Sequence, residues 1–251
     1  MKVIRHGDAA EIVFDSPPVN AYSIPFLESV ADAMTSLPSE VIAVVVTSSV
    51  DRIFAAGGDL KFMAAANRAV SDGYVTLVQE TYSLFESTRY ATIAAIDGAC
   101  LGGGMELALA CDIRIASRGA RLGLPEVGLG IIAGGGAIHR LVRAVGQGIA
   151  RDMLITGEPV GAEQAHSWGL VSRLVDADAA TAGRELAIRL AAGAPEAIRA
   201  TKELAMAAST TDLATGLRNE YLAWMDVRTT FDAQEGLEAF AERRPPRYGR
   251  T

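Results

Sequence analysis

The sequence has few of the residues that form disulfides or bind metal ions. Only two of its 251 residues are cysteines and only three are histidines. Cys100 and Cys111 lie in apolar or glycine-rich sequence, so we expect buried free thiols and a reducing compartment. The histidines are far apart and none belongs to a His-Glu-x-x-His pattern. The sequence therefore predicts neither a disulfide framework nor a metal site.

Excess positive charge and long apolar runs are also lacking. The net charge of −7 argues against a broad surface for nucleic acid or anionic lipid, because both attract basic faces. The longest apolar stretches are interrupted by charge or glycine well before the roughly 20 residues that cross a bilayer. Residues 1–14 show no apolar core of a signal peptide. We expect a cytoplasmic protein with no nucleic-acid partner and no membrane attachment.

Several nucleotide-binding and catalytic signatures are absent. No lysine follows a glycine as in a Walker A loop, and no Gly-x-Ser-x-Gly elbow occurs. Residues 128–133 match the Gly-x-Gly-x-x-Ala form of the dinucleotide fingerprint, which should directly follow a buried strand. Pro125 and Glu126 interrupt the segment before it, and proline is disfavoured within a central strand. The match therefore does not indicate a Rossmann site.

The sequence does contain enough apolar material for a substantial core. Half of the residues are hydrophobic, which fits one large domain or a domain with an appendage. Short apolar or β-branched runs predict strands at 10–14, 41–47, 92–97, 111–116 and 170–175. Segments of helical length lie between them, at 24–37, 69–88, 103–110, 136–145, 147–155 and 162–168. The alternation predicts an α/β layered fold.

After Val175 the pattern changes to consecutive helices, which predicts a helical appendage. The expected helices are 179–192, 195–208, 212–227 and 232–242. The tail at 242–250 is basic and interrupted by proline, so it cannot continue the last helix. It is either a solvated terminus or a segment that binds an anion.

Two glutamates in glycine-flanked stretches give the strongest indication of chemistry. Glu106 follows Gly102-Gly103-Gly104, and Glu126 lies between Gly123 and Gly128. Because glycine has no Cβ, a substrate can approach the backbone N–H groups beside each acid. Either glutamate alone reads as an ordinary first-turn or loop acid. Together with the glycines they predict a site that binds an oxyanion and moves a proton beside it.

A second glycine loop strengthens this interpretation. Phe54 to Lys61 contains Gly57-Gly58 between a predicted strand and a helix, and alone this pair could simply form a tight turn. Together with the stretch 101–106 it offers a second backbone N–H donor. Two such donors are what a carbonyl becoming an enolate needs.

Seven motifs occur in a fixed order along nearly the whole chain, at 17–21, 54–60, 94–107, 111–116, 124–130, 154–157 and 165–171. In this order they resemble the enoyl-CoA hydratase/isomerase, or crotonase, superfamily. The resemblance implies a spiral of ββα units at 1–194, with an acyl-CoA active site, and a helical trimerisation region at 195–251. It also implies a homotrimer or a hexamer built as a dimer of trimers.

The resemblance further implies an enzyme that hydrates 2-trans-enoyl-CoA to 3-hydroxyacyl-CoA, with no cofactor beyond the coenzyme A of its substrate. The N–H groups of Gly58 and Gly103 match the family's oxyanion hole, and Glu106 and Glu126 match its two acids. Glu126 would donate the proton to Cα, and Glu106 would orient or deprotonate the water. The expected substrate and CoA contacts are Ala56, Asp59, Leu60, Lys61, Phe240 and Arg243, with Arg52, Arg244 and Arg247 as further candidates for the phosphates.

The chain departs from the family pattern in two places. Gly58 stands where many members have alanine. The glycine keeps the backbone N–H group and makes the backbone looser. The segment 133–140 differs from the usual Pro-Gly-Ala-Gly-Gly-Thr-Gln-Arg, and this change affects the shape of the acyl pocket. We expect His139 to be a packing or surface residue. Four apolar residues either shape an acyl tunnel or pack in the core: Phe62, Met63, Tyr74 and Leu84.

Two other functions stay open from the sequence. The same scaffold could carry out a Δ3-Δ2 enoyl-CoA isomerisation or another thioester-enolate reaction, for which one carboxylate is enough to move a proton. A relative without catalysis could bind acyl-CoA or serve as a scaffold. The intact acids and glycines favour a hydratase over both alternatives.

Overall fold

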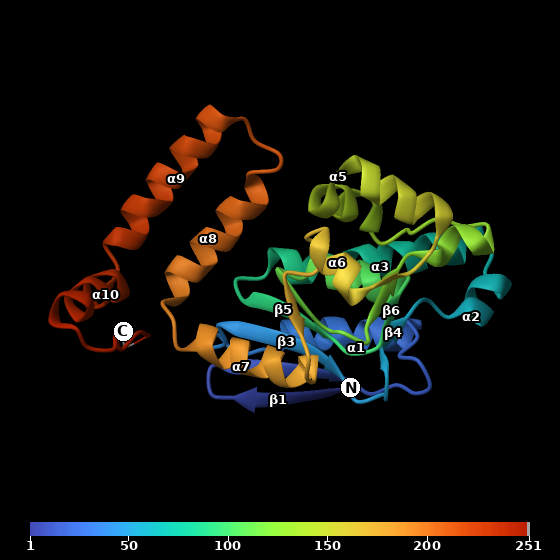
Figure 1. The fold of residues 1–251 in the computed structure, drawn as a ribbon, viewed down its shortest axis with the longest axis horizontal. Helices are drawn as coiled ribbons and strands as arrows, with labels where there is room; N and C mark the ends of the chain where they lie inside the picture. Colours follow the sequence, from blue (N-terminus) through green and yellow to red (C-terminus); the bar gives the residue numbers. More distant parts are fainter. Residues whose placement is uncertain (250–251) are drawn as a thin grey trace.

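Six strands form the main sheet of the computed structural model, which describes residues 1–249 (Figure 1). In spatial order they are β1 (Lys2–His6), β2 (Ala9–Phe14), β3 (Ala43–Ser48), β5 (Ala91–Ile96), β7 (Ile113–Ser117) and β10 (Arg173–Val175). β1 pairs antiparallel with β2, and the other neighbours are parallel. The helices between parallel strands make the crossover connections that such pairing requires.

The central strands are apolar on both faces because helices cover both. Side chains alternate along a strand, so Val44 and Val46 of β3 point to one side and Val45 to the other. Val44 and Val46 share a core with residues of α1 (Ile24–Thr35) and α3 (Arg68–Ser87). Val45 packs with Leu186 of α7 (Ala179–Ala191) on the opposite face. Continuous apolar runs such as that of β3 are typical of parallel strands buried on both faces.

A second, smaller sheet forms the turn of each ββα unit. It contains β4 (Ile53–Ala56), β6 (Ala99–Leu101), β8 (Arg121–Gly123) and β9 (Val160–Gly161). β4, β6 and β8 follow β3, β5 and β7 in the chain, and pair parallel with Ala56 opposite Leu101 and Leu101 opposite Gly123. Because the ends of these strands lie in register, the loops that follow them meet at one edge.

The remaining helices belong either to the spiral or to the C-terminal segment that follows it. They are α2 (Leu60–Ala65), α4 (Gly103–Ala110), the 3-10 helix η1 (Pro125–Leu129), α5 (Ala137–Thr156), α6 (Ala162–Ser167), α8 (Pro195–Ala207), α9 (Leu213–Arg228) and α10 (Phe231–Glu242). Gly146 has φ 75° inside α5, which separates the two segments predicted at 136–145 and 147–155. The predicted helices are thus confirmed to within a few residues.

Two kinds of strand depart from the prediction. Five were missed, namely β1, β4, β6, β8 and β9. β1 is mostly exposed, and the other four have only two to four residues without a clear apolar period, so the sequence carries little signal for them. The strand expected at 170–175 is wrong in its first half, because Leu170 and Val171 form a buried turn whose N–H groups bond to Ala165 O.

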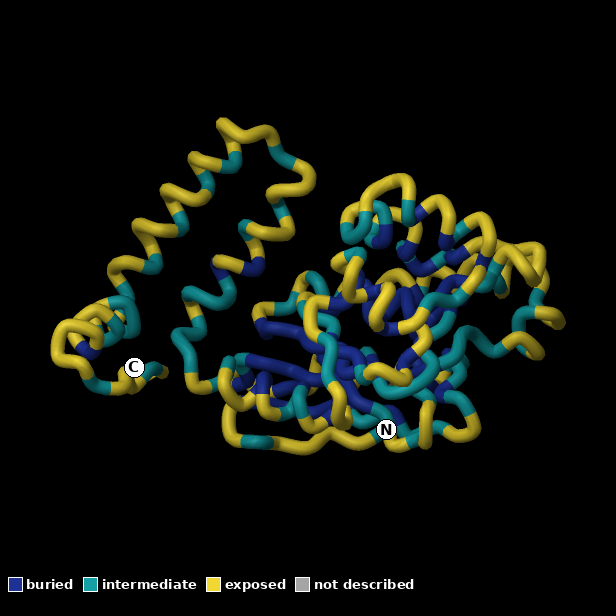
Figure 2. Tube along the Cα trace, in the orientation of Figure 1, coloured by how far each residue is buried: buried dark blue, intermediate teal, exposed yellow. Residues whose placement is uncertain are grey.

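α8, α9 and α10 form an arm that projects from the core, and Figure 2 shows its surface to be largely exposed. One buried side chain fastens the arm to the core. Lys202 Nζ lies 2.8 Å from Phe85 O, 2.9 Å from Tyr90 O and 2.9 Å from Asp112 Oδ2. The helical appendage predicted after Val175 is wrong for its first helix, because α7 packs against the main sheet and only α8 to α10 form the arm. The last two residues of the region implied at 195–251 lie outside the described residues.

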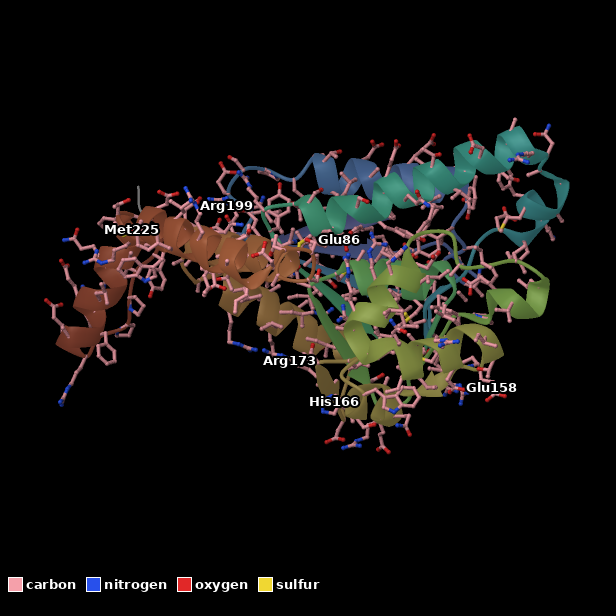
Figure 3. All side chains as sticks on the ribbon, turned by 90° about the horizontal axis from the view of Figure 1, so that it is seen from above. Glu86, Glu158, His166, Arg173, Arg199 and Met225 are labelled. Carbon is pink, nitrogen blue, oxygen red and sulfur yellow. The ribbon has the colours of Figure 1, made fainter. Side chains whose placement is uncertain are left out.

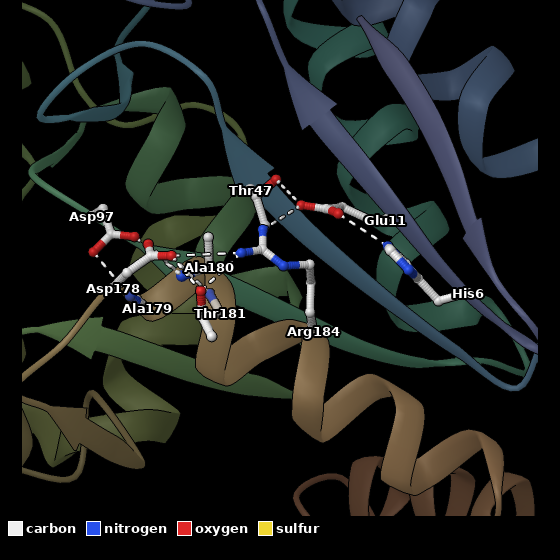
Figure 4. A network of polar contacts seen from close by, with 9 residues as sticks. All are labelled: His6, Glu11, Thr47, Asp97, Asp178, Ala179, Ala180, Thr181 and Arg184. Carbon is white, nitrogen blue, oxygen red and sulfur yellow. Dashed lines mark hydrogen bonds and ion pairs between the residues drawn. The ribbon is translucent and has the colours of Figure 1, made fainter.

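A polar network joins β2 and β3 to α7, on the face of the main sheet away from α1 and α3 (Figure 4). Glu11 is 4% exposed and accepts hydrogen bonds from Thr47 Oγ1 at 2.8 Å and Arg184 Nη1 at 3.0 Å. His6 Nε2 lies 3.1 Å from the other carboxylate oxygen of Glu11, Oε2. Arg184 also approaches Asp178, which caps α7. This network fastens α7 to the sheet.

None of the helices within residues 1–249 combines the length and the apolar character that a membrane span requires.

Candidate active site

Glu106 is placed by glycines at the start of α4. β6 ends at Leu101, and Gly102 turns the chain with φ 52° into the helix. A Cβ on Gly104 would lie 2.2 Å from Ala55 O, so α4 packs against β4 more closely than any other residue allows. All eight residues of α4 are buried. The close packing carries Glu106 into the interior, where it is 5% exposed.

Burial changes the acidity of Glu106. It raises the pKa of this carboxyl to about 7, with a further upward contribution from nearby Glu126, while the N–H groups of Gly135 and Ala137 and the Arg140 charge oppose the rise. Gly135 N donates a hydrogen bond to Oε1 at 2.7 Å. A carboxyl with a pKa near neutrality is suited to give and take protons at physiological pH.

Glu126 reaches the same place from η1. Its Oε2 is buried without a hydrogen bond to any of the described residues, and burial raises its pKa, opposed by its own N–H. Its Oε1 lies 3.1 Å from the position that a Cβ on Gly102 would take. A buried carboxylate oxygen without a hydrogen bond destabilises a protein interior, so it indicates a place for a proton, water or ligand.

Both acids line one inner cavity of about 220 Å³. Its walls come from the loops after β4, β6 and β8, from α3, and from the segment before α5. The lining residues are Ala56, Gly57, Gly58, Leu60, Met63, Tyr74, Val75, Val78, Tyr82, Leu101, Gly102, Gly103, Glu106, Pro125, Glu126, Leu129, Ile131, Ile132, Gly134 and Gly135. Glu106 and Glu126 are the only charged groups among them. The cavity is therefore apolar and carries negative charge alone.

The backbone N–H groups of Gly58 and Gly103 border this cavity, and neither has a protein acceptor within residues 1–249. Gly103 is the first residue of α4, so its N–H has no partner inside the helix and lies at the positive end of the helix dipole. Gly58 follows Gly57, whose carbonyl accepts from Tyr22 N at 3.0 Å. The structure thus brings the two predicted glycines and the two predicted acids together.

Tyrosines from α3 support both glycine loops, and sequence reasoning missed this role. Tyr74 Oη donates to Tyr22 O at 2.7 Å, and Tyr82 Oη donates to Gly103 O at 3.0 Å. Burial, with Glu106 and Asp59 nearby, raises the pKa of Tyr74 to about 12, so it stays a donor at neutral pH. The two residues are eight positions apart on the buried face of α3, a spacing that was available in the sequence.

The other expected contacts near Gly58 have different surroundings. Ala56 and Leu60 line the inner cavity. Asp59 caps α2, where its Oδ1 accepts from Lys61 N and Phe62 N at 3.1 Å each. Lys61 is exposed in the first turn of α2. Arg52 lines a separate surface depression that contains neither acid. Arg52 thus lies apart from the cavity, whereas Lys61 is next in the chain to Leu60, which lines it.

The expected contacts from the C-terminal segment lie far from the cavity within one chain. Phe240 is 86% exposed on α10, at the end of the molecule opposite α2, and Arg243 ends that helix (Figure 1). Arg244 forms ion pairs with Glu235 and Glu242. None of these residues lines the cavity of its own chain.

A wider outer groove of about 1020 Å³ adjoins the inner cavity. Met63 and Tyr74 line both spaces, and Phe62 lines the outer one, as a tunnel lining would. Leu84 instead packs against the core. His139 is exposed at the groove, as expected for a surface residue. Met63 and Tyr74 are also what a Cβ on Gly58 would meet, at 3.0 Å each.

Comparisons with known proteins agree with this geometry. The model of the enoyl-CoA hydratase/isomerase family matches residues 5–251. YngF of Bacillus subtilis, named for enoyl-CoA hydratases/isomerases, is 38% identical over 249 residues, which cover 98% of this chain and 96% of YngF. The mitochondrial methylglutaconyl-CoA hydratase of Mus musculus is 37% identical over 236 residues, covering 91% and 75%. The crystal structure of an enoyl-CoA hydratase from Bacillus anthracis has a TM-score of 0.94 at 35% identity and 98% coverage of both chains.

Proposed function

The chain belongs to the enoyl-CoA hydratase/isomerase family, and we propose that it hydrates 2-trans-enoyl-CoA thioesters to 3-hydroxyacyl-CoA. One observation carries the proposal. Two carboxyls with raised pKa values, Glu106 and Glu126, line the same small cavity as two unpaired backbone N–H groups. Hydration needs both elements. The acids transfer protons as water adds across the double bond, and the N–H groups stabilise the enolate oxygen.

The N–H groups of Gly58 and Gly103 would hold the thioester oxygen. When water attacks Cβ, the electron pair of the double bond moves towards Cα and negative charge develops on that oxygen. Donors fixed in position before the reaction stabilise this charge more than they stabilise the substrate. Loss of one such donor typically raises the barrier by roughly 3 kcal/mol.

The two glutamates would share one water between them. Its hydroxyl adds to Cβ, Cα receives a proton, and the net proton count of the pair is unchanged. We assign Glu126 as the proton donor to Cα and Glu106 as the group that orients or deprotonates the water. Because close acids titrate as a coupled pair, the pH dependence belongs to both carboxyls together.

The charge of the cavity selects among acyl groups. A methylglutaconyl group ends in a carboxylate, whereas the inner cavity here offers two acids and no basic side chain among its lining residues. A third carboxylate there would be desolvated and repelled. We therefore propose uncharged acyl groups as substrates. Crotonyl-CoA should be hydrated with a much higher kcat/KM than glutaconyl-CoA, and an equal or reversed preference would reject this selectivity.

Substitution of each acid tests the proposed reaction. Glu106→Gln and Glu126→Gln should each reduce hydration of crotonyl-CoA at least about 100-fold, in the range lost with a general acid or base. Glu158→Gln is the matched control, because Glu158 is exposed at the edge of the molecule in Figure 3. Near-wild-type rates in both cavity variants would reject the mechanism.

An isomerase is the second candidate, and it has its own support. The Oε2 atom of Glu126 has no hydrogen bond, whereas Gly135 binds Glu106, so Glu126 alone could carry a proton between two carbons. Product analysis with 3-enoyl and 2-enoyl substrates in ¹⁸O-labelled water separates the two reactions. Only hydration incorporates the label.

A further inference from the structure

We propose that Arg140, held in place by Glu86, is a positioning residue that fixes the Gly134–Gly136 loop against Glu106. The inference deepens the proposed hydration by naming a device that sets the state of one of its acids. Neither residue lines the inner cavity, so neither would touch the substrate. Their action would reach the reaction only through the loop.

The glycine loop depends on outside groups for its shape. Gly134, Gly135 and Gly136 have no side chains, and glycine has the greatest backbone freedom to lose. A Cβ on Gly135 would lie 2.6 Å from Tyr82 Cε2 and 2.8 Å from Val78 Cγ1, so no larger residue fits there. Since side chains cannot stiffen the loop from within, hydrogen bonds from neighbouring elements must do so.

Arg140 supplies one of these bonds from the first turn of α5. Its Nη1 donates to Gly135 O at 2.7 Å, while Gly135 N donates to Glu106 Oε1 at 2.7 Å. Gly135 is thus held on its carbonyl side by Arg140 and gives its N–H to the acid. Gln79 Nε2 donates to Gly134 O at 2.7 Å and holds the neighbouring peptide from α3.

Glu86 prevents Arg140 from turning away. Arg140 Nε lies 2.8 Å from Glu86 Oε1, and Nη2 lies 2.6 Å from Oε2. This two-point pairing fixes the plane of the guanidinium, which a single ammonium group cannot do. The Arg140 side chain is only 13% exposed. Figure 3 labels Glu86 near the C-terminal end of α3, where its side chain is 30% exposed.

The expected consequence is a change in the titration of Glu106. The Gly135 N–H bond favours the ionised carboxylate and so opposes the rise in pKa that burial causes, and the Arg140 charge acts in the same direction. If Arg140 is removed, the loop loosens and the pKa of Glu106 should rise further. The acidic limb of the pH profile, which reports the coupled pair, then moves to higher pH.

The test compares Arg140→Met, Arg140→Lys and Glu86→Gln with Arg143→Met. Arg143 is exposed one turn further along α5 and forms no ion pair within the described residues, so it is a matched control. The readouts are kcat and KM for crotonyl-CoA from pH 5 to 9, thermal unfolding, and titration of Glu106 by ¹³C NMR, assigned with Glu106→Gln.

We expect Arg140→Met to lower kcat about 10- to 100-fold with a smaller change in KM, as small displacements of catalytic groups do. Its NMR titration and pH limb should move upwards, Arg140→Lys should recover little, and Arg143→Met should match the wild type. Glu86→Gln should change kcat and the titration of Glu106 in the same direction, but less than Arg140→Met does. Should Arg140→Met fail to fold, Arg140→Lys and Glu86→Gln carry the same expectation.

A folded Arg140→Met or Arg140→Lys variant with wild-type titration of Glu106 and wild-type kcat would overturn the positioning role. The NMR titration needs no substrate. A wild-type protein that hydrates no enoyl-CoA would reject the proposed function, whereas an unchanged titration in the variants rejects this inference alone.

Discussion

Two glycines lie where the backbone passes close to the two acids. A Cβ on Gly102 would lie 3.1 Å from Glu126 Oε1, and one on Gly135 would lie 2.9 Å from Glu106 Oε2. These glycines do more than form turns, because they leave the space in which two carboxyls can face one cavity. At the scale of single residues, the site is therefore defined by missing side chains as much as by reactive ones.

Gly104 gives a direct test of this close packing. Gly104→Ala would place a Cβ 2.2 Å from Ala55 O, a main-chain atom that cannot move aside without shifting β4. We expect a loss of about 3 kcal/mol in the free energy of unfolding, the upper part of the usual range for overpacking. Urea denaturation measures it.

Gly119 is the matched control, because a Cβ there would meet nothing within 4 Å. Gly119→Ala should change the stability by less than about 0.5 kcal/mol, as surface substitutions usually do. Equal stabilities of the two alanine variants would show that α4 and β4 are not in obligatory contact.

Glu106 and Glu126 stand out in the sequence because each lies in a glycine-flanked motif, and the family resemblance added Gly58 and Gly103. The structure lines one cavity with all four residues, and their roles in a reaction stay a prediction. The sequence was not sufficient to find Gly135 or Tyr82. Gly135 bonds to Glu106 across 29 positions, and Tyr82 bonds to Gly103 across 21. Such contacts depend on how α3, α4 and the segment before α5 pack, and no short-range pattern encodes that packing.

At the scale of elements, three short strands decide where the site forms. β4, β6 and β8 align side by side, and the loops after them carry Gly58, Gly103 and Glu126 to one edge. Amphipathic or buried helices such as 103–110 were predicted within a residue or two, because they are long enough to show a repeating or continuous apolar pattern. Strands of three or four residues are too short to show such a pattern, and their register depends on the main-sheet strands before them.

The attachment of α7 to the main sheet should depend on pH through Glu11. Burial alone would raise the pKa of Glu11, but hydrogen bonds from Thr47, His6 and Arg184 lower it overall. A carboxyl with a lowered pKa stabilises the fold above its unfolded-state pKa, and the contribution is lost as pH falls through the folded-state value. Glu11→Gln should therefore be less stable than wild type at pH 7.

The difference in stability should shrink between about pH 5 and pH 3, because protonation removes the same charge from the wild type. Urea denaturation at several pH values measures this difference, with Glu158→Gln as an exposed control. A gap that is constant or widens on acidification would show that the charge of Glu11 does not hold α7.

At the scale of the molecule, the arm presents an apolar face that no other part of residues 1–249 covers. Leu217, Tyr221 and Trp224 lie at helical spacing on α9 and are 56%, 63% and 62% exposed. A soluble monomer rarely exposes such a stripe. It supports the trimer or dimer of trimers that the family resemblance implies, in which the tail of a neighbour would also bring Phe240 and Arg243 to a substrate.

Leu217→Glu and Trp224→Glu should each lower the mass measured by light scattering towards that of one chain, because a charge would have to be buried at the interface. Exposed Glu220 on the same helix supplies a control, Glu220→Gln, which should keep the wild-type mass. Unchanged mass in both glutamate variants would exclude this face of α9 as the interface.

The most direct test of the whole account is the hydration rate of the double variant Glu106→Gln/Glu126→Gln, measured beside the two single variants with crotonyl-CoA. Residues that act together on one water lose activity as a unit, so the double variant should be within about tenfold of the slower single variant. Losses that multiply, or a double variant with near-wild-type activity, would contradict the shared water on which the mechanism depends.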